Sequence, residues 1–135
     1  MTDTTKEYAS EFPELPYEVW PSGQTVSKAG FGTYRIALGN DGHALALMKA
    51  ITSGINLIDT STNYSFGASE SLIGEVMKVL EQDVKRSDLV IITKIGYLQG
   101  PLLEDAKTRE EAGNPYPDMV KIGEDIWHCI HPEIL

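Results

Sequence analysis

Two short apolar runs, separated by one amphipathic segment, dominate the hydrophobic pattern of the chain. The run 55–58 ends at Asp59, and the β-branched run 89–93 ends at Lys94. Near-continuous apolar runs of this length are typical of parallel strands that are covered on both faces. The segment 69–80 between them carries apolar residues at helical spacing. The pattern therefore predicts a strand–helix–strand unit in which Asp59 and Lys94 emerge at the same edge of a parallel sheet.

The segments around this unit also have recognisable patterns. Residues 17–27 have the pattern of a hairpin with glycine in its turn, and residues 29–36 that of a first strand. A helix is predicted to begin after the N-cap Asn40 and to end at Gly54. In the helix over 69–80, the predicted buried stripe is Leu72, Ile73, Val76, Val79 and Leu80, and Gly74 is expected to allow close packing on a strand.

The two ends of the chain carry weaker patterns. Residues 1–16 are predicted to be an extended lead without a helix, and residues 98–135 a loop-rich tail broken by glycine and proline. The whole chain, 1–135, is expected to form a single domain.

Four short motifs resemble the aldo-keto reductases, TIM-barrel enzymes that reduce carbonyl compounds with a nicotinamide cofactor. They are Gly-Phe-Gly-Thr-Tyr at 30–34, the stretch 54–64, Ser-Glu at 69–70 with Ile-Gly at 73–74, and Ile-Ile-Thr-Lys at 91–94. The resemblance covers about residues 17–97. It implies an α/β fold that is part of a (β/α)8 TIM barrel: an N-terminal hairpin plus about three βα units of parallel sheet.

The resemblance also implies a site. Asp59, Tyr64 and Lys94 correspond to catalytic residues, and the cofactor-binding residues would be Gly32, Thr33, Tyr34 and Asp59. NADPH is the expected cofactor, with NADH not excluded, and the substrate would be a small-molecule aldehyde or ketone. The family's histidine on the next strand has no convincing match, because His128 and His131 lie in a loop-like context next to proline.

The chemistry of the three catalytic candidates is consistent with proton donation. A phenol with a pKa near ~10 is too weak an acid at neutral pH unless a nearby charge stabilises the phenolate. Lys94 beside Tyr64 would do this, and Asp59 would hold Lys94 charged. Taken singly, Asp59 as a loop cap, Tyr64 as a rim aromatic and Lys94 as a solvated strand end are equally good interpretations.

Length, charge and cysteine content narrow the possible partners. At 135 residues the chain is shorter than the roughly 250 residues of a closed eight-stranded barrel. An open sheet has unpaired edges, so self-association through them is possible. The net charge of −9, with no basic surplus in any part, argues against nucleic acid and anionic membrane as partners. The lone Cys129 and the absence of an apolar span or secretion signal predict a cytoplasmic protein.

The sequence raises three further hypotheses. A metal site at His128, Cys129 and His131 lacks a fourth ligand, so no metal is expected. A phosphoacceptor receiver domain would need an acidic pair at the end of the first strand, where the chain has Gly-Phe-Gly-Thr-Tyr. The third is a non-catalytic binding or assembly module derived from the reductase fold. For the chain by itself, we expect no carbonyl reduction at an enzyme-like rate.

Overall fold

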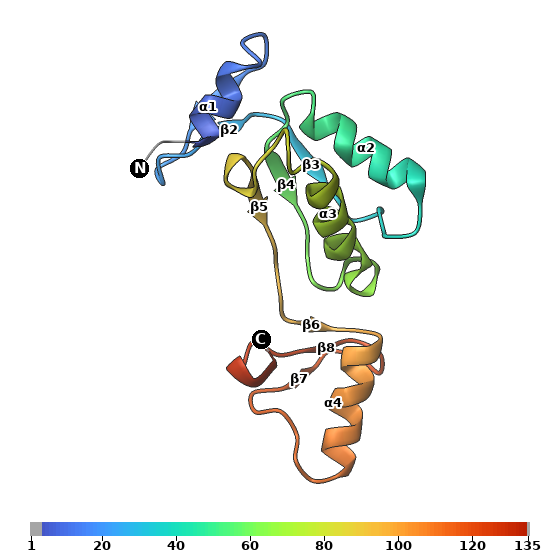
Figure 1. Ribbon diagram of the computed structural model, residues 1–135. Helices are drawn as coiled ribbons and strands as arrows, with labels where there is room; N and C mark the ends of the chain where they lie inside the picture. The colour runs from blue at the N-terminus through green and yellow to red at the C-terminus, as the bar shows by residue number, and fades with distance from the viewer. Residues whose placement is uncertain (1–3, 135) are drawn as a thin grey trace. The chain divides into compact units, whose positions relative to one another are not determined.

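The computed structural model describes residues 4–134, which form two compact units (Figure 1). The first unit extends to Thr93, and the second begins at Lys94. Among the described residues, no helix is both long enough and apolar enough to cross a lipid bilayer. Each unit has its own hydrophobic core.

An open parallel sheet lies at the centre of the first unit. Its strands are β3 (Gly30–Gly32), β4 (Leu57–Asp59) and β5 (Val90–Ile92), in the order β3-β4-β5. Both pairings are parallel, as predicted. The sheet does not close on itself, so the arrangement fits part of a (β/α)8 barrel. The first strand is shorter than the predicted 29–36, since the chain leaves the sheet after Gly32.

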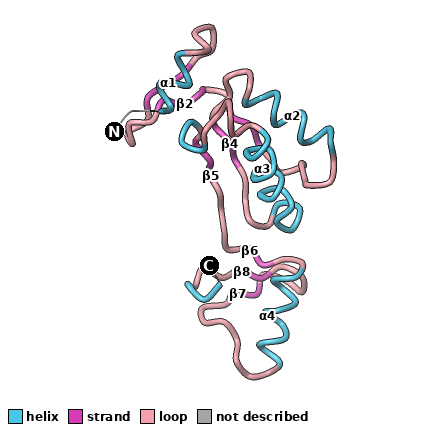
Figure 2. Tube along the Cα trace, in the orientation of Figure 1, coloured by secondary structure: helices cyan, strands magenta, loops and turns pink. Residues whose placement is uncertain are grey.

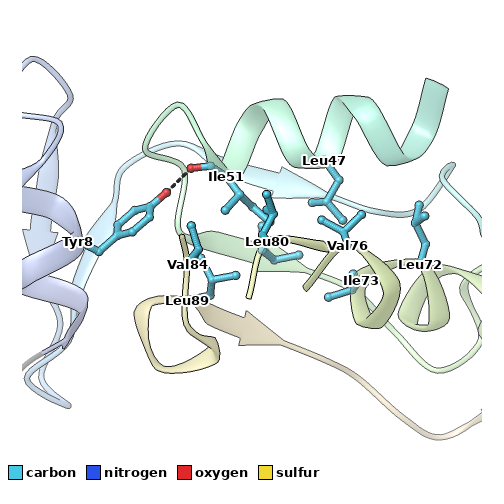
Figure 3. Packing of buried hydrophobic residues seen from close by; sticks show 10 residues of the cluster. Tyr8, Leu47, Ile51, Leu72, Ile73, Val76, Leu80, Val84 and Leu89 are labelled. Atoms are coloured by element: carbon cyan, nitrogen blue, oxygen red, sulfur yellow. Dashed lines mark hydrogen bonds between the residues drawn. The ribbon is translucent and has the colours of Figure 1, made fainter. Parts of the chain in front are cut away.

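Two helices cover one face of this sheet, α2 (Asp41–Ile51) and α3 (Ala68–Val79) (Figure 1). The side chain of Asn40 accepts a hydrogen bond from the amide of His43, which confirms the predicted N-cap. The helices meet the sheet through a continuous core (Figure 3). Its buried members are Tyr8, Leu47, Ile51, Ile58, Leu72, Ile73, Val76, Leu80, Val84 and Leu89.

Two predictions about α3 were wrong. Val79 was placed in the buried stripe, but its side chain is 65% exposed because the helix ends there and Leu80 packs inward in its place. Gly74 was expected to pack closely on a strand. A Cβ atom at Gly74 would have no neighbour within 4 Å, so this glycine faces open space.

The predicted hairpin is present, but the segment before it is helical. Strands β1 (Tyr17–Val19) and β2 (Thr25–Ser27) pair antiparallel. The prediction of an extended lead over 1–16 was wrong at α1 (Thr4–Ser10), which is a short helix, while residues 1–3 lie outside the described residues. Tertiary contacts stabilise it: the buried Tyr8 hydroxyl donates a hydrogen bond to the carbonyl of Ile51 (Figure 3), and the Thr5 hydroxyl accepts one from the amide of Thr25. A polar seven-residue segment would not hold a helix alone.

The buried side chain of Asn56 joins the hairpin to the parallel sheet. Its Oδ1 accepts a hydrogen bond from the amide of Ser27 at 2.8 Å. Its Nδ2 donates to the carbonyls of Thr25 at 2.9 Å and Asp88 at 3.3 Å. Asp88 ends the 3-10 helix η2 (Arg86–Asp88), which leads into β5. One amide therefore links three segments that are far apart in sequence.

The second unit is a small antiparallel sheet packed on a helix. Strands β6 (Tyr97–Leu98), β8 (Trp127–His128) and β7 (Val120–Lys121) lie in that order, with α4 (Pro101–Glu111) against one face and the 3-10 helix η3 (Pro132–Ile134) at the end. Its buried core is Leu98, Leu103, Ala106, Trp127 and Cys129.

The tail is thus more regular than the sequence indicated. The interpretation of 98–135 as loop-rich was wrong at α4, an eleven-residue helix with Pro101 in its first turn. Many residues of this helix are charged. Some of these charges are paired, since Lys107 lies 3.6 Å from Glu104 and 3.5 Å from Asp125. The loop-like context inferred for His128 was also wrong, because His128 lies in β8 next to the buried Trp127.

Candidate active site

The candidate site lies at the carboxyl end of the parallel sheet. There the pairing aligns three residues of neighbouring strands: Gly32 with Asp59, and Asp59 with Ile92. One position earlier in each strand, Phe31, Ile58 and Ile91 are aligned in the same way, and they pack against the core under α2 and α3. Because successive residues of a strand point to opposite faces, Asp59 lies on the face away from the helices. This is the face that lines the interior of a barrel.

A hydroxyl network fixes the backbone at which Asp59 leaves the sheet. The amide and the Oγ1 of Thr33 donate to the carbonyl of Asp59 at 2.9 and 3.0 Å. The carbonyl of Thr33 accepts a hydrogen bond from Ser69 Oγ at 2.8 Å. Thr33 and Ser69 are both fully buried. This clamp joins the ends of β3 and β4 to the start of α3.

Two tyrosines meet above this edge from the loops that follow β3 and β4 (Figure 2 shows both loops). The rings of Tyr34 and Tyr64 are in edge-to-face contact, with centroids 5.1 Å apart and an interplanar angle of 80°. Tyr34 is 65% exposed, whereas Tyr64 is half-buried. The contact brings together one predicted catalytic residue and one predicted cofactor-binding residue.

The turn after Tyr64 has an unusual backbone. Tyr64 begins the 3-10 helix η1 (Tyr64–Gly67), within which Ser65 and Phe66 have left-handed φ values of 49° and 54°. A non-glycine residue pays roughly 1–2 kcal/mol for this conformation. Phe66 is 69% exposed, so core packing does not hold it there. Strained turns of this kind concentrate at ligand-binding and catalytic positions.

Lys94 follows the end of β5. It is two residues beyond Ile92, which is aligned with Asp59. The preceding residue, Thr93, donates a hydrogen bond from Oγ1 to Glu70 Oε1 at 2.6 Å, which ties the end of β5 to α3. The convergence of Lys94 with Asp59 and Tyr64 stays a prediction.

A pocket of about 430 Å³ lies on the opposite face of the sheet. It is lined by α3 and β5, and its members are Thr60, Glu70, Ile73, Gly74, Met77, Arg86, Ile91 and Thr93. Ile91 packs toward the core on the helix-covered face, whereas Asp59 is on the other face. The pocket is therefore separate from the candidate chemistry. Within 4–134, no group of three or more His, Cys, Asp and Glu side chains is arranged to hold a metal ion.

The sequence reasoning missed the residues that brace the site. Ser69 and Glu70 were noted only as part of a motif, yet they bind the ends of β3 and β5. Asn56 was read as one member of an apolar run, although its amide is completely buried. A polar residue inside an otherwise apolar strand was the available signal, because such a residue must find hydrogen-bond partners.

The sheet, its two covering helices and the polar carboxyl edge define an α/β protein of the barrel class. Comparison with known proteins identifies the family: residues 28–122 match the model of the aldo/keto reductase family, and the chain belongs to that family.

Individual relatives agree with this assignment. The chain is 31% identical over 108 residues to an NADH-specific methylglyoxal reductase from Escherichia coli, covering 72% of this chain and 32% of that one. It is 37% identical over 87 residues to a putative voltage-gated potassium channel subunit beta from Schizosaccharomyces pombe, covering 61% and 24%. It is similar to the holo form of an aldo-keto reductase from Bacillus halodurans, with a TM-score of 0.51, 28% identity and coverage of 64% and 28%. The chain thus spans about a third or less of the length of these relatives.

Proposed function

We propose that this chain carries the proton-donating part of an NAD(P)H-dependent carbonyl reductase site. The observation that supports this most directly is the alignment of Gly32, Asp59 and Ile92 on the helix-free face of the sheet. The Tyr34–Tyr64 ring contact adds to it, because it brings the tyrosine to the same carboxyl-end loops. The substrate class is small aldehydes and ketones.

In the proposed reaction Tyr64 is the general acid. A bound nicotinamide would supply the hydride to the carbonyl carbon, and the Tyr64 hydroxyl would give its proton to the carbonyl oxygen. Lys94 is proposed to stabilise the resulting phenolate. Asp59 is proposed to keep Lys94 charged and fixed in position. The proposal is supported by the short distance along the chain, because Lys94 follows Ile92, the partner of Asp59 in the sheet, by two residues.

The nicotinamide end of the cofactor is proposed to lie against Gly32 and Tyr34. A Cβ at Gly32 would meet nothing within 4 Å, so this position presents open backbone beside Asp59. The exposed Tyr34 ring offers a flat stacking surface. Thr33 is proposed to act by holding the Asp59 backbone, because its own side chain is buried. NADPH remains the expected cofactor, while one relative is by name NADH-specific.

By itself the chain is proposed to reduce carbonyls far more slowly than an enzyme. The site would lie on an open sheet, and water at Tyr64 weakens the electrostatic stabilisation that proton donation to a carbonyl needs. No histidine is placed with Asp59 and Tyr64 among the described residues of the first unit, in which His43 accepts a hydrogen bond from Ala37. Self-association through the edges of β3 and β5, and a cytoplasmic location, stay proposals.

Cofactor binding tests the proposal more sensitively than turnover does. NADPH and NADH are titrated into the wild-type chain and the Gly32→Val variant, and binding is followed by the fluorescence of the reduced nicotinamide. The added side chain projects into open space, so the fold should persist while binding weakens at least tenfold. Gly74→Ala is the matched control, because its new methyl group is equally unhindered but lies on the helix away from the site. Equal weakening in both variants, or none in either, contradicts the proposed position.

Turnover is measured by nicotinamide oxidation with an activated aldehyde. We expect a slow rate that Tyr64→Phe abolishes and Tyr97→Phe, which alters an exposed tyrosine of the second unit, leaves unchanged. A slow rate that survives Tyr64→Phe would remove this residue from the mechanism. An enzyme-like rate lost in Tyr64→Phe would show that the chain alone is a sufficient catalyst.

A non-catalytic binding module is the second candidate function. One relative carries the name of a putative channel subunit, which favours a role in assembly. Cofactor binding that depends on Gly32 without any turnover that depends on Tyr64 would favour this candidate. The family assignment leaves the phosphoacceptor alternative without support.

A further inference from the structure

The small sheet of the second unit has one face that its own helix does not cover. Leu98, Trp127 and Lys121 form a row across β6, β8 and β7. Leu98 and Trp127 belong to the core that packs on α4, and Lys121 pairs with Glu110 of α4. The adjacent row, Tyr97, His128 and Val120, therefore points away from α4.

Alternation extends this second row into an apolar face. Ile122 and Ile126 are joined across the β7–β8 turn by an amide-to-carbonyl hydrogen bond of 3.0 Å, and Cys129 pairs with Gly96 at 2.8 Å, so the strands continue beyond their assigned ends. Ile122, Ile126 and Ile130 each lie two positions from the row and share its side. We call these residues the outer face: Tyr97, Val120, Ile122, Ile126, His128 and Ile130.

The outer face contains no Lys, Arg, Asp or Glu and, apart from the half-buried His128, is exposed. Its aliphatic and aromatic members are between 39% and 63% exposed, with Ile126 the lowest and Ile130 the highest. Its only titratable side chains are Tyr97 and His128, whose rings touch edge to face at 5.2 Å. From the exposed fractions, the apolar side-chain surface is on the order of 500 Å², at the upper end of what a monomer's largest patch usually shows.

We propose that the outer face is a homodimer interface, formed by face-to-face packing of two copies of this sheet. A twofold pairing brings the same patch together from each chain, so an apolar face without Lys, Arg, Asp or Glu complements itself without charge pairing. The area of this face is smaller than the roughly 800 Å² per partner of a stable interface, so the dimer should be weak and concentration-dependent. The inference is independent of the proposed reductase site.

The charge distribution of the second unit agrees with this orientation. Residues 94–135 carry eight acidic and four basic side chains, and four of the acidic ones, Glu104, Asp105, Glu110 and Glu111, are on α4. The sheet separates α4 from the outer face, so these charges would lie on the outside of the dimer. Repulsion between two acidic chains remains, and salt screens it. Dimerisation should therefore strengthen as salt concentration rises, whereas a contact made by opposite charges would weaken.

The test is the mass of the full chain in solution. Sedimentation velocity and light scattering are run from low to high micromolar protein, at low and high salt. We expect a concentration-dependent dimer in the wild type and at least a tenfold weaker dimer in Ile122→Lys/Ile130→Lys, where lysines of two copies would face each other. The matched control is Leu45→Lys/Val79→Lys, which changes two equally exposed aliphatic residues of α2 and α3 and should dimerise as the wild type does.

A second measurement does not depend on the variants folding. In a mixture of isotope-labelled and unlabelled wild-type chains, the methyl groups of Val120 and Ile122 should show contacts to the outer face of the other copy. A wild type that stays monomeric at every concentration overturns the proposal. A dimer that survives the double lysine variant, or that the control variant disrupts, overturns it as well.

Discussion

Gly74 offers a test of the packing in the first unit. The structure determines whether its replacement by alanine should raise or lower the free energy of unfolding. It lies in the middle of α3, and a Cβ atom there would meet nothing within 4 Å. Glycine in a helix interior is less favourable than alanine by roughly 0.8–1.0 kcal/mol. No steric overlap offsets this gain, so Gly74→Ala should raise the free energy of unfolding by about 1 kcal/mol.

The assay must report on the first unit alone, since the second has a separate core. Hydrogen exchange of the β4 amides reports on the first unit. A gain of about 1 kcal/mol in its free energy of unfolding should slow the exchange of these amides through unfolding roughly fivefold. For a unit of this size, the melting temperature should rise by roughly 4–8 °C.

Gly54→Ala is the matched control, and it should lower the free energy of unfolding. Gly54 has a φ of +97°, and its Cβ would lie 2.5 Å from Leu15 Cδ1 and 2.7 Å from Phe12 Cγ. Both variants make the same change to the unfolded chain, so their difference isolates the folded state. Faster exchange in Gly74→Ala would refute the reasoning, because it would mean that the space beside α3 is occupied.

Two further substitutions test buried hydrogen bonds. Tyr8→Phe removes the donor to the Ile51 carbonyl and should cost about 1–2 kcal/mol at neutral pH. Burial raises the pKa of Tyr8 above its ordinary value of 10.0, so the unfolded chain loses this proton first as pH increases. Wild-type stability should therefore fall above pH 10, and the fall should be shallower in Tyr8→Phe; parallel urea midpoints across this range would contradict the assignment. Asn56→Ala should cost about 2–4 kcal/mol, because several buried partners lose their bonds, against about 1 kcal/mol for the N-cap variant Asn40→Ala. Equal midpoints for the two asparagine variants would show that the Asn56 network is not stabilising.

The parts of the fold that were predictable from sequence are those in which local pattern and tertiary structure agree. The apolar run 89–93 is mostly β-branched, and its residues Val90–Ile92 form the predicted parallel strand. Asn40 is an N-cap by both composition and geometry. The family resemblance was correct, since residues 28–122 match the family model.

The errors fall where distant contacts override local preference. Thr4–Ser10 is a helix because Tyr8 and Thr5 have partners in α2 and β2, which no local pattern reveals. The segment 107–111 is charged on all sides, yet it completes a helix that is anchored by Leu103 and Ala106. For the site, the sequence indicated that Gly32 and Asp59 lie at strand ends, but not the bracing of that edge by Thr33 and Ser69.

The amide of Asn56 also constrains the order in which the first unit can fold. Its partners lie 29 and 31 residues before it and 32 residues after it. Until both segments arrive, water must satisfy the amide, so burial of β4 with one partner missing is unfavourable. Two long loops must therefore close before this strand can leave solvent, and such closure is slow relative to helix formation. We therefore expect hairpin docking and β5 pairing to be coupled in one late, cooperative folding step.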